Sequence, residues 1–238
     1  MTDHSRRTLL GHLLGAVALL VVKASNSSEV NSERGSEDRA ERLVARTHKL
    51  LTGLHAPELT PFLDEWPTVL QRRRIVPASV PVLRWLPEIQ GATPEFSGSL
   101  VAALVAAAPF LAWRRSYTAV EVGAAFFNNY GWTELVGLTG PVASEHLACG
   151  MLLLGPRVTY PRHRHEAEEI YVPLAGGPAL WQGEDDHWLE RPPGSVIHHA
   201  RHEPHAMQTG QSPLLALYLW RSANLAQKSQ LDPAPGPT

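Results

Sequence analysis

Cysteine is nearly absent from this chain, which contains one such residue, Cys149, among 238. A single cysteine excludes an intrachain disulfide and argues against a thiolate metal site, and its apolar neighbours predict a buried strand position. An excess of one charge is lacking too, since 21 Lys and Arg against 23 Asp and Glu give a formal net charge of −2. This balance provides no electrostatic basis for binding nucleic acid.

Long hydrophobic runs are also missing. The apolar segment from Leu9 to Val22 is interrupted by two glycines and a histidine, which leaves it too short for a stable membrane span. The pair Arg6-Arg7 precedes this segment, and the arrangement resembles a Tat export signal. We therefore expect a leader and a disordered polar linker within residues 1–36, which favours a periplasmic location. The alternative is a cytoplasmic protein with an N-terminal extension.

The rest of the chain shows two different sequence patterns. Apolar residues at helical spacing and Thr-Pro start signals predict helices within residues 37–130: one over about 36–54, one from Thr60, and one from Thr93 to about Trp113. From residue 131, short β-rich runs alternate with turn residues, a pattern typical of a sandwich or barrel. The expected strands are 134–138, 145–154, 169–174, 179–182, 188–190, 195–198 and 214–220. We expect an α+β fold with its β domain over 131–222 and a disordered tail over 223–238.

The run from His163 to Tyr171 carries the densest chemistry in the sequence. Side chains two positions apart share one face of a β-strand, so His163 pairs with His165 and Glu169 with Tyr171. The short Glu-Ala-Glu stretch between the two pairs can bulge or turn. Farther along, His205 can complete the set. Imidazole nitrogen and carboxylate oxygen suit one divalent transition metal, with Zn, Fe, Mn, Co and Ni all acceptable.

A cluster of histidines in the sequence does not by itself indicate a metal site. Seven of the chain's twelve histidines lie between positions 163 and 205. A solvated loop accounts for His198, His199 and His202, and a hairpin turn accounts for His187. The remaining three histidines of this region are the ones that fit the ligand spacing.

The spacing of these residues resembles two motifs of the cupin family. Gly155 leads into His163-x-His165-x3-Glu169-x6-Gly176, which is similar to the first cupin motif with a slightly longer lead-in. A longer form of the second motif resembles Pro193-Gly194 followed by Pro204-His205. Over about 145–222 the chain is similar to the cupin-type dimethylsulfoniopropionate (DMSP) lyases, through Tyr160-Pro161, Glu169-Ile-Tyr171, Pro204-His205-Ala206-Met207 and Leu214–Trp220.

This resemblance implies a helical N-terminal region followed by a C-terminal cupin β-barrel, or jelly roll. It implies a lyase that splits DMSP by β-elimination into dimethyl sulfide and acrylate. The implied metal ligands are His163, His165, Glu169 and His205. Tyr171 would ligate or abut the metal and act as the catalytic base, with Tyr160 nearby in the pocket. A phenol with an ordinary pKa near ~10 is a poor base at neutral pH, but a neighbouring dication favours its phenolate.

The sulfonium end of such a substrate is a cation, and aromatic faces bind cations with roughly 0.5–2 kcal/mol per contact. The aromatic candidates in the β-rich half are Tyr160, Trp181, Trp188, Tyr218 and Trp220. Core packing is the alternative role for each of them, and Tyr160 with Trp220 is the preferred pair. The expected partner is a small sulfonium molecule, and a homodimer is compatible with the sequence.

Two other functions fit the same ligand set. One is a different cupin metalloenzyme, such as a dioxygenase or an isomerase, although a dioxygenase has no general need for Tyr171. The other is a non-catalytic cupin that binds a small ligand. The absence of a helix-turn-helix signature and the complete ligand set argue against a regulatory cupin.

Overall fold

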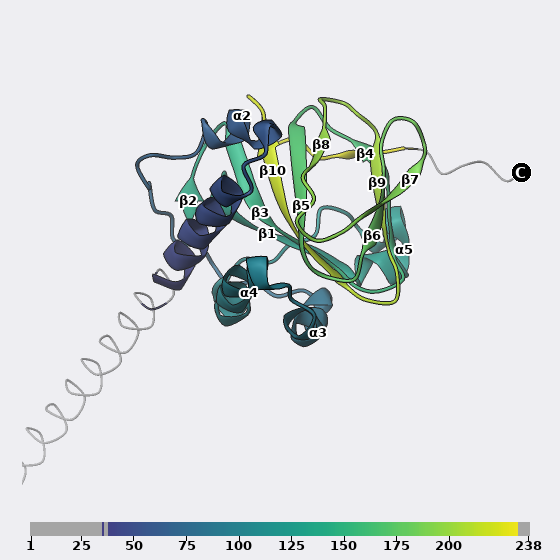
Figure 1. Ribbon diagram of the computed structural model, residues 1–238, viewed down its shortest axis with the longest axis horizontal. Helices are drawn as coiled ribbons and strands as arrows, with labels where there is room; N and C mark the ends of the chain where they lie inside the picture. The colour runs from purple at the N-terminus through teal and green to yellow at the C-terminus, as the bar shows by residue number, and fades with distance from the viewer. Residues whose placement is uncertain (1–34, 36–37, 233–238) are drawn as a thin grey trace, which may run out of the picture. The chain divides into compact units, whose positions relative to one another are not determined.

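A computed structural model describes Gly35 and residues 38–232 of the chain (Figure 1). From Arg39 onward, the described residues belong to one compact unit. Apart from Gly35, the expected leader and linker in residues 1–36 lie outside the described residues. Within the described part, none of the helices combines the length and the apolar character needed to cross a bilayer.

Helices make up the first part of this unit, as the sequence predicts. They are the helix over residues 38–53, η1 (Pro57–Leu59), α2 (Thr60–Leu63), η2 (Pro81–Trp85), α3 (Leu86–Gly91), α4 (Glu95–Ala107), η3 (Ala108–Phe110) and α5 (Ala119–Phe127). The predicted third helix is too long, because α4 ends at Ala107 and not near Trp113. The sequence analysis missed α5, which begins with a capping box. Thr118 accepts a hydrogen bond from the backbone amide of Glu121, and the Glu121 carboxylate accepts one from that of Thr118.

Two facing β-sheets form the second part, which confirms the predicted helical region followed by a jelly roll (Figure 1). The strands are β1 (Tyr130–Gly137), β2 (Val142–Ala143), β3 (Leu147–Leu154), β4 (Thr159–Arg164), β5 (Glu168–Gly176), β6 (Ala179–Gln182), β7 (Trp188–Arg191), β8 (Ile197–His199), β9 (His205–Thr209), β10 (Leu214–Arg221) and β11 (Gln230–Leu231). The six-stranded sheet has the order β2-β1-β3-β10-β5-β8, and the five-stranded sheet has the order β11-β4-β9-β6-β7.

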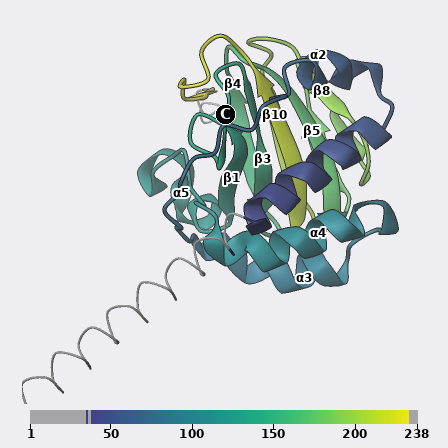
Figure 2. The same cartoon turned by 90° about the vertical axis from the view of Figure 1, so that its left-hand side faces the viewer.

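Strand alternation decides which residues of the six-stranded sheet face the helices. Odd positions on β3 and β10, such as Cys149 and Leu217, are buried in one core with Leu43 and Leu104 of the covering helices (Figure 2). This confirms the prediction that Cys149 is a small core residue. Even positions point to the space between the sheets, because successive side chains of a strand point to opposite faces. The candidate site residues lie on this inner face.

Two of the sequence predictions need correction. The tail prediction is wrong for β11, which pairs with β4 at Arg164 and His163. This pairing is supported by Asp232, whose carboxylate lies 2.5 Å from an Arg164 guanidinium nitrogen. The predicted apolar stripe of α4 is correct for Leu100 and Leu104, but Phe96 is 44% exposed.

Candidate active site

Three strands bring the four predicted ligand side chains together. His163 lies near the end of β4, His165 in the turn that follows, Glu169 in β5, and His205 at the start of β9. The pairing of β4 with β9 places His163 opposite His205. All four residues are buried, and one potential ligand atom from each lies within 4.8 Å of the others.

Backbone carbonyls fix the orientation of all three imidazoles. The Nδ1 atoms of His163, His165 and His205 lie 2.8, 2.9 and 2.9 Å from the carbonyl oxygens of Pro161, Ala167 and Glu203. A carbonyl can only accept, so each Nδ1 is protonated, which leaves Nε2 as the nitrogen that binds a metal when it carries no proton. This is the arrangement that metal-binding histidines usually have.

The carboxylate of Glu169 is the hub of the cluster. One of its oxygens, Oε2, lies 2.7 Å from Nε2 of His165 and 3.1 Å from Nε2 of His205. Burial alone would raise the pKa of Glu169, but the neighbouring histidines outweigh it and hold the pKa well below its ordinary value. Burial lowers the pKa of His165, yet the charge of Glu169 and the hydrogen bond to it leave that pKa raised. In the absence of a metal, His165 and Glu169 are therefore joined by a buried hydrogen bond that contains one proton.

These residues fit a single divalent metal ion. Nε2 of His205 is buried 3.1 Å from Oε2 of Glu169 and makes no other hydrogen bond within the described part of the chain, so its lone pair is available to a metal. Metal bonds of about 2.0–2.2 Å place ligand atoms on opposite sides of one ion about 4 Å apart, which is close to the observed spread. Burial and the neighbouring His205 hold the pKa of His163 well below its ordinary value, so this imidazole is neutral and available as a ligand.

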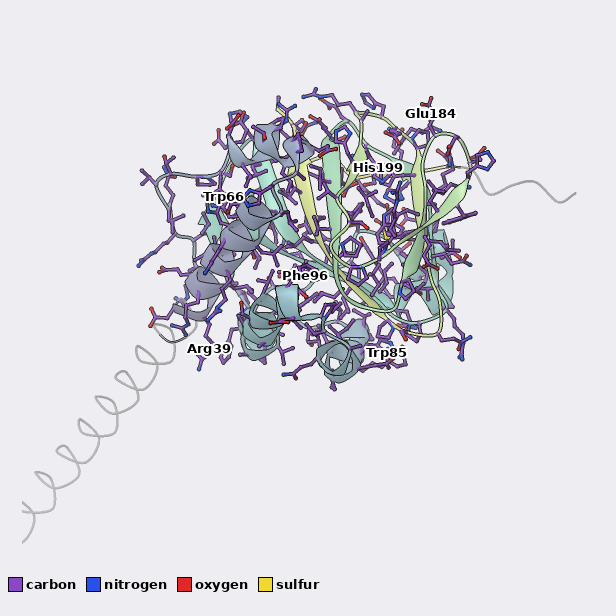
Figure 3. The ribbon with its side chains drawn as sticks, in the orientation of Figure 1. Arg39, Trp66, Trp85, Phe96, Glu184 and His199 are labelled. Carbon is purple, nitrogen blue, oxygen red and sulfur yellow. The ribbon has the colours of Figure 1, made fainter. Side chains whose placement is uncertain are left out.

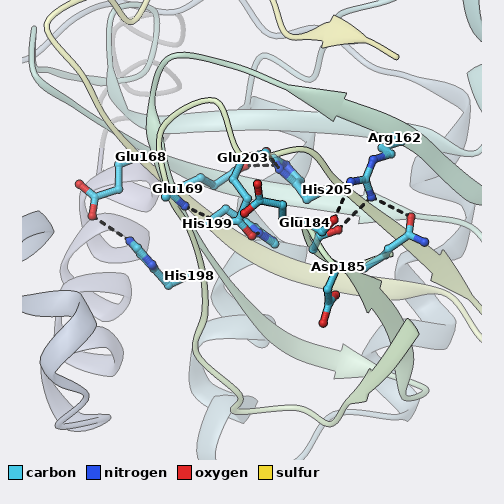
Figure 4. A network of polar contacts seen from close by, with 12 residues as sticks. Arg162, Glu168, Glu169, Glu184, Asp185, His198, His199, Glu203 and His205 are labelled. Carbon is cyan, nitrogen blue, oxygen red and sulfur yellow. Dashed lines mark hydrogen bonds and ion pairs between the residues drawn. The ribbon is translucent and has the colours of Figure 1, made fainter. Parts of the chain in front are cut away.

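The prediction that His199 is a solvated loop residue is wrong. It lies in β8, is only 3% exposed and stacks on His205 with ring centroids 4.2 Å apart. Its Nδ1 lies 3.2 Å from Oε1 of Glu203, the residue whose carbonyl orients His205 (Figure 4). His198 and His202 are exposed, as predicted, and so is His187 on its hairpin turn.

A cavity of about 480 Å³ reaches the ligand cluster at Glu169, the one of the four ligand residues that lines it. The predicted residues Tyr160, Tyr171, Tyr218 and Trp220 all line it, together with Glu169. Two other aromatic candidates do not line it. Trp181 is buried behind the cavity wall at 2% exposure, and Trp188 lies 39% exposed on the edge strand β7.

A second group of lining residues was not predicted from the sequence. It includes Ser116, Tyr130, Trp132 and Glu134, together with residues 225–229. Tyr130, Trp132 and Glu134 occupy alternate positions of β1, so the alternation of that strand could have placed them on one face. No local signal in the sequence indicated that this face would meet the ligand cluster.

The tyrosines of the cavity are neutral in the metal-free protein. Burial first, and then the charge of Glu169 and a hydrogen bond to it, raise the pKa of Tyr171 well above its ordinary value. Burial also raises the pKa of Tyr160, whose hydroxyl lies 3.4 Å from those of Tyr117 and Tyr130. The ring of Tyr160 stacks on His163 at 4.2 Å between centroids, which fixes its position beside the cluster.

Trp220 connects the aromatic wall to the cluster. Its indole Nε1 donates a 2.6 Å hydrogen bond to Oε1 of Glu169, and its ring lies 4.3 Å from that of His165 between centroids. The indole thus orients the carboxylate without being a ligand itself.

Replacing Trp220 with phenylalanine should weaken metal binding by roughly 10–100-fold, the usual cost of losing a partner that orients a ligand. The affinity can be measured by competition with a chromophoric chelator. Trp188→Phe is the matched control, because that indole is on an exposed edge strand and should leave the affinity unchanged. Equal affinities for Trp220→Phe and the wild type would show that this hydrogen bond does not tune the site.

Comparison with known proteins agrees with this geometry. The family model described as dimethylsulfoniopropionate lyase matches residues 63–216. A DMSP lyase, DddQ, from Ruegeria pomeroyi is 33% identical over 171 residues, which are 71% of this chain and 84% of the relative. A putative DMSP lyase, DddL, from Cereibacter sphaeroides is 35% identical over 120 residues, which are 50% of this chain and 49% of that protein.

Solved structures of DMSP lyases superimpose on most of the chain. A structure from work on the DMSP lyases RdDddP and RnDddQII gives a TM-score of 0.74 at 33% identity, covering 84% of this chain and 100% of the other. The crystal structure of DddQ from Ruegeria pomeroyi gives a TM-score of 0.72 at 29% identity, covering 82% and 96%. With the family model matching more than half of the chain and a curated relative 33% identical over 84% of its own length, this chain belongs to the dimethylsulfoniopropionate lyase family.

Proposed function

We propose that this protein cleaves DMSP into dimethyl sulfide and acrylate, using one divalent transition metal and a tyrosine base. The observation that carries the proposal is that Tyr171 and Glu169, the carboxylate of the buried three-histidine, one-carboxylate cluster, line the same cavity with aromatic walls. Family membership supports the substrate class, because the curated relative DddQ is named for this reaction.

The ligands in this proposal are His163, His165, Glu169 and His205. A metal held there would act as a Lewis acid toward the substrate carboxylate and would favour the phenolate of Tyr171. Tyr171 itself lies on β5 two residues from Glu169, so its side chain shares a face with that carboxylate. Without a dication, its raised pKa keeps it protonated at neutral pH, and the base role therefore depends on metal loading.

The proposed elimination uses the chain's own residues for the proton transfer. The phenolate oxygen of Tyr171 takes the proton from the carbon next to the substrate carboxylate. The electron pair of that C–H bond forms the C=C bond of acrylate. The C–S bond breaks, and its electron pair leaves with sulfur as neutral dimethyl sulfide. Tyr171 then returns its proton to solvent, so that charge and atoms balance over the cycle.

Tyr160 has a different role in this proposal, because its hydroxyl lies 3.4 Å from the neutral hydroxyls of Tyr117 and Tyr130, and its pKa is raised. A neutral phenol can donate a hydrogen bond to the substrate but cannot act as a base. Tyr218 and Trp220 supply aromatic surface next to Tyr171, and aromatic faces attract the sulfonium cation.

The test is headspace dimethyl sulfide from purified protein supplied with DMSP. Parallel samples are loaded with Fe(II), Mn(II), Zn(II), Co(II) or Ni(II), and one sample is chelated. We expect metal-dependent release with an equal amount of acrylate. If protein with measured bound metal releases none, the proposal is wrong. Oxygen consumption with small thiols or diketones would then be the measurement that separates a dioxygenase from a binding protein.

A further inference from the structure

The cavity extends well beyond the ligand cluster. Trp132 and Glu134 of β1, three strands away from Tyr171 in the sheet, mark the outer part of its lining, and residues 225–229 line the cavity as well. At about 480 Å³ it lies in the range of roughly 300–1,000 Å³ that holds drug-sized ligands. A substrate that has its carboxylate at the cluster would extend its other end toward this outer part.

A row of paired residues leads across the six-stranded sheet from Tyr171 to this outer part. Tyr171 pairs with Tyr218, Tyr218 with Gly150, and Gly150 with Glu134. Directly paired residues share a face, and strands are about 4.8 Å apart, so the backbones of Tyr171 and Glu134 are separated by about 14 Å. Tyr218 lies between them.

Because Gly150 has no side chain, the ring of Tyr218 has room to lie over it. A Cβ atom at position 150 would lie 2.7 Å from the Tyr218 hydroxyl oxygen and 2.1 Å from the carbonyl oxygen of Thr133. The ring of Tyr218 thus lies over β3 and meets the ring of Trp132 edge-on, with centroids 6.3 Å apart and planes at 89°. Burial first, and then the carboxylate of Glu134, raise the pKa of Tyr218, which places the two side chains within electrostatic reach.

Glu134 is a fixed carboxylate with one uncommitted oxygen. Oε1 accepts hydrogen bonds from the Thr139 amide at 2.5 Å, the Thr139 hydroxyl at 3.0 Å and the Gly140 amide at 2.8 Å. Arg73 holds the same turn by donating to the carbonyls of Gly137 and Gly140 at 3.1 and 3.2 Å. Within residues 38–232, no hydrogen bond or ion pair is made to Oε2.

Among the charged residues that line the cavity, none forms an ion pair with Glu134. Glu134 and Glu169 are the acidic residues among its lining, and Glu169 belongs to the ligand cluster. Lys228 also lines the cavity, but its ammonium lies 2.5 Å from the Glu121 carboxylate and 5.2 Å from the ring centroid of Tyr117. The charge of Lys228 is therefore balanced by Glu121, which does not line the cavity.

We propose that Glu134, Trp132 and Tyr218 form a subsite for the onium end of the substrate, a sulfonium or quaternary ammonium group. The aromatic faces supply cation–π attraction, and the fixed carboxylate supplies a charge that acts over several ångströms in a cavity of low dielectric. Tyr160 and Trp220 are the pair preferred from sequence. They are left out of this subsite because each has its ring close to a histidine of the ligand cluster. This inference rests on the proposed function for the identity of the substrate, but the binding of an onium cation does not require turnover.

Glu134→Gln is the variant that tests the subsite. The glutamine amide oxygen can still accept from Thr139 and Gly140, so the turn is retained while the charge is removed. Calorimetry on the full chain loaded with Zn(II) would compare trimethylsulfonium, which has the cation and no carboxylate, with 3-(methylthio)propionate, which has the carboxylate and no sulfur charge. Glu184→Gln is the matched control, because Glu184 is exposed on the outer turn between β6 and β7 (Figure 3).

We expect Glu134→Gln to weaken trimethylsulfonium binding about tenfold and to change 3-(methylthio)propionate binding less than about twofold. With DMSP, KM should rise by a similar factor while kcat changes little. Unchanged trimethylsulfonium affinity in Glu134→Gln would overturn the subsite even if DMSP is cleaved. Loss of that affinity in protein that never releases dimethyl sulfide would support the subsite and reject the lyase proposal. If Glu134→Gln does not fold, Tyr218→Leu removes an aromatic face, and full affinity in that variant would also overturn the subsite.

Discussion

Replacing Tyr171 with phenylalanine should slow dimethyl sulfide release from DMSP by about 10²–10⁴-fold, the usual contribution of a positioned base. The substitution keeps the ring and removes the oxygen that accepts the proton. It leaves the four clustered ligand residues in place, so the variant should still bind its metal. The measurements are headspace dimethyl sulfide and metal content by mass spectrometry on the same sample.

Tyr117→Phe is the matched control for this prediction. Tyr117 is a buried phenol whose hydroxyl contacts that of Tyr160 at 3.4 Å, but it does not line the cavity. Losing one neutral hydrogen bond should cost less than about tenfold. Full activity in metal-loaded Tyr171→Phe would exclude Tyr171 as the base.

The pH dependence gives a second test of the same role. In the metal-free protein the pKa of Tyr171 is raised, so the phenol stays protonated through neutral pH. The active form in our proposal is the phenolate, which means that the rate of the metal-loaded wild type rises with pH until this group is deprotonated. Tyr171→Phe should lose that rise. A rate that falls as pH increases over this range would be the wrong sign for a base.

Replacing His205 with alanine should abolish stoichiometric metal binding and, with it, elimination. His205 is completely buried, and apart from Oε2 of Glu169 at 3.1 Å its Nε2 has no polar partner among the described residues, so the imidazole is positioned as a ligand. The loss of affinity should exceed the roughly 10–100-fold that follows from losing an orienting partner. Metal content after dialysis gives the direct measurement.

Thermal stability provides a readout of His205→Ala that is independent of activity. A ligand that binds the folded state and is present at a concentration of 100 times its Kd stabilises that state by about 2.7 kcal/mol. Metal should therefore raise the Tm of the wild type. The Tm of His205→Ala should not respond to metal. His198→Ala is the control, because His198 is exposed and pairs with Glu168, and it should behave like the wild type. A metal-dependent rise in Tm for His205→Ala would remove this residue from the ligand set.

Much of the ligand cluster was accessible from sequence because its geometry is local. His163 and His165 are two residues apart, as are Glu169 and Tyr171, and the period of a β-strand places each pair on one face. The turn over residues 166–167 then folds one pair back on the other. His205 was named from the sequence only as a residue that can complete the set, since the β4–β9 pairing that places it opposite His163 joins residues distant in sequence.

Features that depend on distant pairings were missed or misassigned. The sequence places His199 beside the exposed His198, but alternation in β8 turns it inward, and the pairing with β5 places it opposite Glu169. The C-terminal segment has the composition of a disordered tail, yet β11 adds to β4, and residues 225–229 form a cavity wall. The pairing of β11 with β4 depends on a free edge of the five-stranded sheet that only the assembled fold provides.

The sequence by itself determined the absence of disulfides, the division into helical and β-rich parts, and the local spacing of the ligand residues, because each follows from composition or from short-range periodicity. Only the tertiary structure decided what shares the cavity with them. Glu134 and Trp132 face Tyr218 because β1, β3 and β10 pair in that order and register. Strand order and register are set by long-range packing, and no local pattern in β1 specifies the strand beside it.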